Sequence, residues 1–250
     1  MTSSPDPFAA IAPFYDQLMA DVPYTRWVDY ALTLFAAAGG DGSRAVDLAT
    51  GTGNVALDLA ERGFSVVGVD CSLPMLREAA RKTTPAHGHV AWACQDLRHL
   101  GLAPRFDFAV CLYDSLNYLA SPRDFTVALR QIAGVLRPGG LLVFDLNSIH
   151  ALEAELFTQE DLDRRTPVRY RWTSRYNRKV RVSVIEMRFW LPPDGREVTV
   201  THRQRGYEIA EVTAALKTAG LDCVGLYDGT GLNPPTDETE RIYFVARRPE

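Results

Sequence analysis

Two aspartates and two glycines stand at the ends of short apolar segments, in a pattern typical of a nucleotide-like ligand site. Asp47 lies four residues before Gly51, Gly53 follows two residues later, and Asp70 ends the next apolar segment. The glycines allow a tight turn from a strand into a helix, whose first N–H groups are free to bind a ligand. An acid at the end of a second strand suits the hydroxyls of a ribose. The pattern therefore predicts a ligand with a nucleoside part.

Asp47 distinguishes between two classes of cofactor. Residues 51–56 also satisfy the Gly-x-Gly-x-x-Ala spacing of dinucleotide sites, so a nicotinamide oxidoreductase is an alternative. A dinucleotide would bring a doubly negative pyrophosphate to this turn, where a carboxylate would repel it. The ammonium and sulfonium groups of S-adenosylmethionine would instead be attracted, and Asp96, after a third apolar segment, extends the acidic set. The residues therefore favour S-adenosylmethionine.

The elements that must position these residues alternate between strand and helix. We expect strands at residues 44–49, 65–70, 90–95, 106–112 and 141–146, and helices at 54–62, 73–82 and 124–136. Pro138-Gly139-Gly140 is expected to end the last of these helices, and Gly63 the first. A helix at 208–219 and strands at 221–227 and 241–247 follow later. Right-handed crossovers place the carboxyl ends of the first five strands on one edge, with helices on both faces of the sheet.

Two further parts are expected to cover that edge. Helices at residues 8–19 and 24–38 would form a cap before the first strand. Long strands at 168–172, 180–191 and 198–207, the last two joined by the turn Pro192-Pro193-Asp194-Gly195, would form an antiparallel lid inserted at about 165–207. No internal repeat or long linker separates these parts, so residues 1–250 are expected to form one domain.

The chain resembles the class I S-adenosylmethionine-dependent methyltransferases over nearly its whole length. Residues 46–53 are similar to their first motif, residues 66–70 to their ribose motif and residues 95–97 to their adenine-side motif. Residues 11–16, 113–119 and 202–207 are similar to a bacterial small-molecule subgroup that includes sugar N-methyltransferases. The resemblance implies a Rossmann-like, seven-stranded, mostly parallel α/β sheet whose last strand runs antiparallel.

The resemblance also implies which residues hold the cofactor. Tyr15 and Arg26 would close over its methionine carboxylate, and residues 112–115 would line the methyl group. Many relatives have a glycine where this chain has Ala49, whose methyl group is expected to narrow the pocket. The expected cofactor-binding residues are Tyr15, Arg26, Asp47, Ala49, Gly51, Gly53, Asp70, Cys71, Asp96, Leu97, Leu112 and Asp114.

Methyl transfer is an in-line displacement, for which holding the nucleophile about 3 Å from the methyl group and excluding water supply most of the catalysis. A base helps only when the acceptor arrives protonated, and His202 and Tyr118 are the candidates for that catalytic role. Asp114, Ser115 and Asn117 are further site candidates, although the same segment could simply begin a capped short helix. We expect no metal, because the pair His87-x-His89 lacks a third ligand.

Basic residues are concentrated in one segment, although the net charge of the chain is −4. Residues 164–181 include eight basic side chains and no acid. On an extended strand, one face would carry Arg169, Arg171 and Arg175 and the other face Tyr170, Trp172 and Tyr176. We favour the interpretation that the arginines form the solvated outer face of the lid and that the aromatic side chains pack inward. An alternative is that the arginines attract an anionic small acceptor. The pI of about 5.8 is unlike that of proteins that bind nucleic acid. An RNA or protein substrate that binds the basic strand is therefore a weaker alternative.

Composition points to a globular cytoplasmic protein. Of the 250 residues, 46% are hydrophobic and 23% charged, and no apolar run is long enough to span a membrane. The first residues lack a basic leader followed by an apolar stretch, and Cys94, Cys111 and Cys223 are expected to be buried thiols. The sequence thus predicts a cytoplasmic methyltransferase acting on N or O of a small molecule, with a non-catalytic S-adenosylmethionine-binding protein as an alternative.

Overall fold

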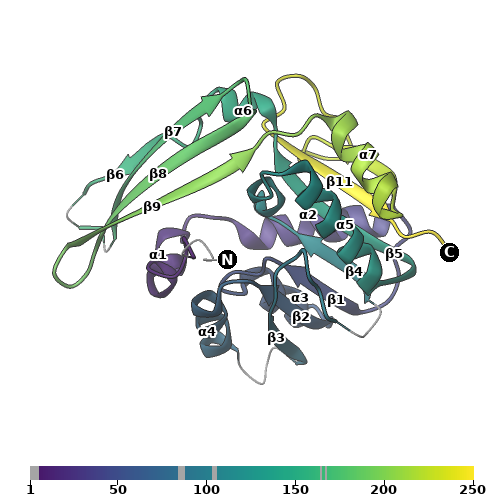
Figure 1. Ribbon diagram of the computed structural model, residues 1–250. Helices are drawn as coiled ribbons and strands as arrows, with labels where there is room; N and C mark the ends of the chain where they lie inside the picture. Colours follow the sequence, from purple (N-terminus) through teal and green to yellow (C-terminus); the bar gives the residue numbers. More distant parts are fainter. Residues whose placement is uncertain (1–5, 84–87, 103–105, 164, 167) are drawn as a thin grey trace.

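The computed structural model describes residues 6–83, 88–102, 106–163, 165–166 and 168–250, so Arg164 and His87 lie outside it (Figure 1). Its larger sheet consists of β1 (Arg44–Leu48), β2 (Ser65–Asp70), β3 (Val90–Cys94), β4 (Phe106–Cys111), β5 (Leu136–Asn147), β10 (Asp222–Tyr227) and β11 (Arg241–Arg247). The spatial order is β10-β11-β5-β4-β1-β2-β3, and β11 runs antiparallel to both of its neighbours. The remaining pairs are parallel. The expected Rossmann-like sheet is confirmed.

Helices cover both faces of this sheet, because its strands are apolar on both sides. The side chains buried by α2 (Tyr24–Ala37) and α3 (Asn54–Glu61) belong to one hydrophobic cluster, and those of α5 (Pro122–Val135) and α7 (Ile209–Ala219) to another. α4 (Leu73–Lys82) packs beside β2 and β3. Of the helices described, none is both long and apolar enough to cross a bilayer.

A second, antiparallel sheet lies between β5 and α7 in the chain. It consists of β6 (Gln159–Asp161), β7 (Arg169–Asn177), β8 (Val182–Leu191) and β9 (Arg196–Arg205), paired in that order, and we call it the lid sheet. Residues 192–195 connect β8 to β9, as expected from their Pro-Pro-Asp-Gly sequence. In Figure 1 the lid sheet projects from the larger sheet and passes above α1 (Tyr15–Leu18). The inserted antiparallel lid is therefore confirmed.

The expected helix at residues 8–19 is wrong. The structure has a short 3-10 helix, η1 (Ala12–Phe14), followed by the single turn of α1. Pro13 has no N–H to donate to a preceding carbonyl, which interrupts a continuous α-helix at this point. The segment instead buries Ile11 and Met19 in a third hydrophobic cluster that it shares with the lid sheet.

Two other expectations, on the end of α5 and on buried cysteines, were wrong, and two short elements were not foreseen. Pro138-Gly139-Gly140 lies within β5, because α5 already ends at Val135 and the strand begins at the next residue. The short elements α6 (Ile149–Glu153) and β6 were not expected. Cys94 is exposed, since β3 is an edge strand and is only partly covered, and Cys223 is half-buried; Cys111 is buried as expected.

A buried amide joins the lid sheet to the larger sheet. Asn117, in the 3-10 helix η3 (Ser115–Tyr118), donates to the carbonyl oxygens of Asn147 at 3.2 Å and Arg205 at 2.8 Å. Its side-chain oxygen accepts from the N–H of Asn147 at 3.0 Å. Asn147 ends β5 and Arg205 ends β9, and the Asn117 side chain is fully buried. Asn117 is therefore a structural residue that does not line the site, unlike the site role considered from the sequence.

We predict that Asn117→Ala lowers the free energy of unfolding by about 3 kcal/mol, because three buried backbone groups lose their partner. Urea unfolding followed by circular dichroism measures this change. Arg130→Ala, at an exposed position of α5, is the control and should change stability by less than about 0.5 kcal/mol. Equal effects of the two substitutions would contradict the linking role of Asn117.

Candidate functional site

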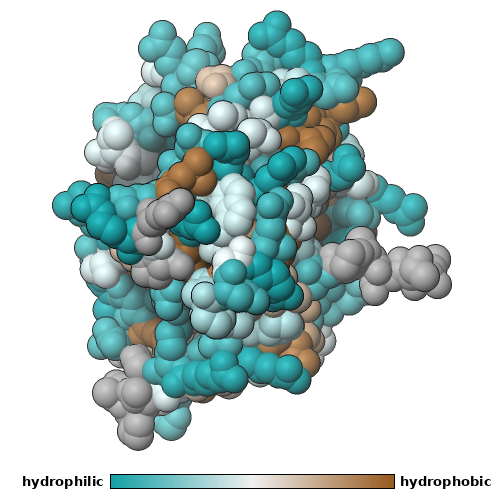
Figure 2. All heavy atoms as spheres, turned by 90° about the vertical axis from the view of Figure 1, so that its left-hand side faces the viewer, coloured by the Kyte–Doolittle hydropathy of each residue, from teal (hydrophilic) through white to brown (hydrophobic). Residues whose placement is uncertain are grey.

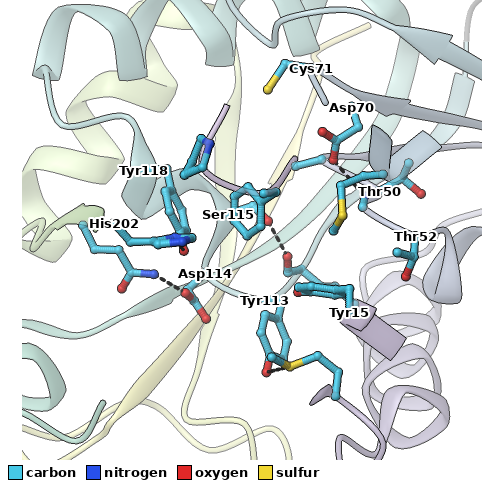
Figure 3. A pocket seen from close by; sticks show the side chains of 18 of the residues that line it. Tyr15, Thr50, Thr52, Asp70, Cys71, Tyr113, Asp114, Ser115, Tyr118 and His202 are labelled. Atoms are coloured by element: carbon cyan, nitrogen blue, oxygen red, sulfur yellow. Dashed lines mark hydrogen bonds between the residues drawn. The ribbon is translucent and has the colours of Figure 1, made fainter. Parts of the chain in front are cut away.

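A cavity of about 1140 Å³ lies at the carboxyl ends of β1, β2 and β4. It is bounded by the larger sheet, the lid sheet and residues 6–19, which we call the N-terminal segment. Single small-molecule sites usually occupy about 300–1,000 Å³, so this cavity has room for two ligands side by side. Figure 3 shows its two ends, with Asp70 and Thr50 on one side and Tyr118 and His202 on the other. Tyr15 and Ser115 lie between them.

The turn after β1 is held by the acid that ends β2. One carboxylate oxygen of Asp70 accepts from the N–H of Gly51 at 2.8 Å, and the other accepts from the N–H of Ser72 at 2.8 Å. Burial raises the pKa of Asp70, and these backbone N–H groups counteract the rise. Each carboxylate oxygen can accept a second hydrogen bond, and Asp70 lines the cavity. It can therefore accept from the hydroxyls of a ligand.

Asp47 lies deeper, with 2% of its surface exposed, and still lines the cavity. It accepts a hydrogen bond from the hydroxyl of Thr50. Burial raises the pKa of Asp47 to about 7, and the nearby Asp70 charge adds to the rise while the Thr50 bond opposes it. A cation bound in the cavity would favour the ionised form.

The glycines of the turn have different tasks. Gly51 lines the cavity and has a φ of +57°, a left-handed conformation that favours glycine. Gly53 does not line the cavity, and a Cβ on it would lie 2.5 Å from the Trp92 ring, so packing also requires a glycine here; its role in cofactor binding stays a prediction. Ala49 lines the cavity with a φ of +57°, which explains why a glycine would fit its position equally well.

Other predicted residues are brought together, with one exception. Tyr15, Cys71, Asp96, Leu97, Leu112 and Asp114 all line the cavity. Arg26 is exposed on α2 and does not line it, so its expected contact with the cofactor is not supported. Burial raises the pKa of Cys71 to about 11, which keeps it a neutral thiol.

Asp96 lies at the cavity and also holds the turn that follows β3. It lines the cavity, and its carboxylate accepts from the N–H of Arg98 at 2.8 Å and forms an ion pair with the Arg98 side chain at 2.5 Å. The hydrogen bonds from Arg98 lower the pKa of Asp96, although burial opposes them. Arg98 also contacts Asp124 at 3.2 Å.

Asp114 belongs to a buried charge network beneath the cavity. Arg241, from β11, contacts Asp114 at 2.9 Å and also binds Asp145 of β5. Gln204 of the lid sheet donates to Asp114 at 2.5 Å. Burial raises the pKa of Asp114 to about 6, and the positive charge of Arg241 limits the rise. Asp114 is therefore ionised at neutral pH.

The two catalytic candidates lie in contact. The Tyr118 hydroxyl is 2.7 Å from Nδ1 of His202, and both residues line the cavity. Among the described residues, none is hydrogen-bonded to Nε2 of His202. Burial lowers the pKa of His202 to about 4 and raises the pKa of Tyr118, so both side chains are neutral at pH 7.

The N-terminal segment forms one wall of the cavity. Asp16 accepts from Thr52 at 2.6 Å and from Lys82 at 2.7 Å, which attaches the segment to the turn after β1 and to α4. At its start the ring of Phe8 packs edge-on against His202, with centroids 4.8 Å apart. The segment thus reaches from the turn after β1, at one end of the cavity, to His202, at the other end.

Sequence reasoning missed several lining residues that come from distant parts of the chain. They are Phe8, Met75, Trp172, Met187, Gln204 and Arg241. Of these, only Gln204 belongs to one of the motifs named above, residues 202–207. Gln204 is a polar residue on a strand face that also carries Val198 and Val200, and this could have indicated a site residue. Arg241 begins a strand more than one hundred residues after Asp114, and no local pattern indicates their contact.

The charge of the lining is predominantly acidic. Among the described residues it includes six aspartates, at positions 6, 47, 70, 96, 114 and 124, and two arginines, at positions 98 and 241. Their negative charge favours a cationic ligand over one that carries phosphate. Of the described residues, no three His, Cys, Asp or Glu side chains are arranged to hold a metal ion.

The sequence is similar to known methyltransferases. Residues 45–140 match a family model described as a methyltransferase domain. YqeM of Bacillus subtilis, provisionally named a methyltransferase, is 31% identical over 246 residues, which cover 96% of this chain and 97% of that protein.

Similar solved structures cover almost the whole chain. A crystal structure of an S-adenosylmethionine-dependent methyltransferase from Clostridium acetobutylicum has a TM-score of 0.84 and 26% identity, covering 98% of this chain and all of that one. The sugar N-methyltransferase KedS8 from Streptoalloteichus has a TM-score of 0.72 and 25% identity, covering 92% and 88%. Together with the sheet order and the acid-lined turn, these matches identify the chain as a member of the class I S-adenosylmethionine-dependent methyltransferases.

Proposed function

We propose that the protein transfers a methyl group from S-adenosylmethionine to a nitrogen or oxygen atom of a small molecule bound in the same cavity. The observation that carries this proposal is an acid-lined cavity with room for two ligands, partly covered by the lid sheet. A hollow of this size between two sheets suits a small acceptor. The similarity to the sugar N-methyltransferase KedS8 supports the same size class.

The residues around the turn after β1 fit the cofactor. Asp70 has free acceptor positions for the ribose hydroxyls, and Leu97 and Met75 offer an apolar surface beside Asp96 for the adenine. Asp47 supplies negative charge near the turn. The bound cofactor supplies a methyl group on a positively charged sulfur. The chain's part is to hold it and to keep water out.

His202 and Tyr118 are proposed to orient the acceptor rather than to remove a proton. A base with a pKa of about 4 takes a proton from an ammonium group very inefficiently. The pair can instead hydrogen-bond a nucleophile that arrives neutral, because both side chains are uncharged and Nε2 of His202 is free of protein partners among the described residues. Correct placement of the nucleophile is then their contribution to the rate.

The proposed function predicts that Asp70→Ala weakens S-adenosylmethionine binding at least tenfold. The substitution removes the carboxylate that accepts from the N–H of Gly51 and that would accept from the ribose hydroxyls. Isothermal calorimetry gives the affinity. Asp222→Ala, an exposed acid at the edge of the sheet, is the matched control and should bind like the parent. Turnover is tested by S-adenosylhomocysteine release with a panel of small amines and phenols, and release without any dependence on added acceptor would contradict the proposal.

Cofactor affinity should rise with pH because of Asp47. Its pKa of about 7 in the free protein means that it is mostly protonated at pH 6 and mostly ionised at pH 8. A cationic cofactor prefers the ionised form, so the affinity is expected to increase by about tenfold between these values. Calorimetry at both pH values checks this. In Asp47→Asn the increase should disappear, and an unchanged pH dependence in that variant would exclude Asp47 as the titrating group.

His202→Gln and Tyr118→Phe are each expected to lower kcat by about ten- to one-hundredfold, because a positioned nucleophile loses its partner. The dissociation constant of S-adenosylmethionine should stay within twofold, since neither residue lies at the cofactor end. Because the pKa of His202 is about 4, the parent rate should show no loss from its protonation between pH 6 and 9. A kcat inflection in that range that His202→Gln removes would show that the residue acts as a base.

A further inference from the structure

The acceptor end of the cavity has apolar walls on two sides. From the lid sheet, alternate residues of β7 and β8 face inward, and from the N-terminal segment come further large apolar side chains. These lining residues are Phe8, Ile11, Leu18, Met19, Trp172, Ile185, Met187 and Phe189. Figure 2 shows the corresponding end of the molecule from outside, where hydrophilic side chains cover most of the face and hydrophobic ones form only small separate areas. The apolar surface here is therefore directed into the cavity.

Both arginines that line the cavity are already neutralised. Arg241 lies between Asp114 and Asp145 and is stacked on the Trp27 ring, 4.9 Å from its centroid. Arg98 is paired with Asp96 at 2.5 Å and Asp124 at 3.2 Å. Among the described lining residues there is consequently no free positive charge for an anionic group.

The basic segment of the lid sheet lies on the opposite face. Trp172 faces the cavity, so its neighbours in β7 face outward: Arg171 is exposed and paired with Glu160 at 2.6 Å, and Arg175 is exposed. Next to Arg171 in the sheet is Arg188 of β8, which is also exposed and is paired with Glu186. These arginines do not line the cavity, which corrects the alternative in which they hold an anionic acceptor.

From this arrangement we propose that the methyl acceptor is a largely apolar small molecule that carries no phosphate or other anionic group. The inference rests on the proposed function, in which the acceptor occupies this end of the cavity. Burying an anion without a cationic partner is strongly unfavourable, and the described lining, with six aspartates and two arginines, has an excess of negative charge that would repel it. An apolar body gains from contact with the lid sheet and the N-terminal segment, and one polar group can reach His202.

Two fluorescent probes that differ by one charge test the proposal. N-phenyl-1-naphthylamine is neutral, and 8-anilino-1-naphthalenesulfonate has the same ring system with a sulfonate. Each is titrated into the full chain saturated with S-adenosylhomocysteine. The neutral probe should bind at least tenfold more tightly than the anionic one. Equal affinities, tighter binding of the anionic probe, or failure of both to bind would overturn the proposal.

Matched substitutions identify where the probes bind. Leu156→Arg adds a cation at a lining position that is 47% exposed, and it should strengthen binding of the anionic probe at least fivefold. Val184→Arg adds the same charge to the outer face, in register with Arg175 and Arg203, and should have no such effect. If Arg171→Ala and Arg175→Ala together weaken binding of the anionic probe, that probe binds the outer face, which agrees with its exclusion from the cavity. Calorimetry with S-adenosylmethionine separates failure of this proposal from failure of the proposed function, because cofactor binding is measured independently.

Discussion

The buried contact of Arg241 with Asp114 and Asp145 fixes the arrangement of the parts around the cavity. Arg241 belongs to the antiparallel strand β11, Asp145 to β5 and Asp114 to the segment after β4, while Gln204 extends the network into the lid sheet. Removing charges from water is costly, so such a network contributes more to a unique geometry than to stability. It places the segment after β4, including the left-handed residue Asp114, at the floor of the site.

The sequence was sufficient for those parts of the site that depend on local chain geometry. Asp47, Gly51 and Asp70 lie at strand ends, and the alternation of strands and helices places such ends on one edge of a sheet. Gly53 has the right spacing but packs against Trp92 and does not line the cavity, because spacing does not reveal which atoms face a ligand. The contact of Arg26 with the cofactor stays a prediction: its position came from resemblance, and its side chain is exposed on α2.

The remainder of the site depends on contacts between distant segments, which periodicity cannot predict. Trp172 was expected on the inner face of a strand, but its place in the cavity follows from the way the lid sheet lies over the N-terminal segment. That segment was expected as one helix, and its actual path, with the break near Pro13, lets Phe8 reach His202. The lid sheet consequently carries charge outside and apolar side chains inside, two properties that its sequence interleaves residue by residue.

The position of the N-terminal segment has a practical consequence for handling the protein. The described chain enters the cavity wall at Asp6 and Phe8, whereas the carboxyl terminus lies at the opposite side of the molecule from α1 in Figure 1. A purification tag fused at the amino end would be attached within a few residues of the acceptor's surroundings. Fusion at the carboxyl end leaves that neighbourhood untouched, which makes it the appropriate design for screening ligands.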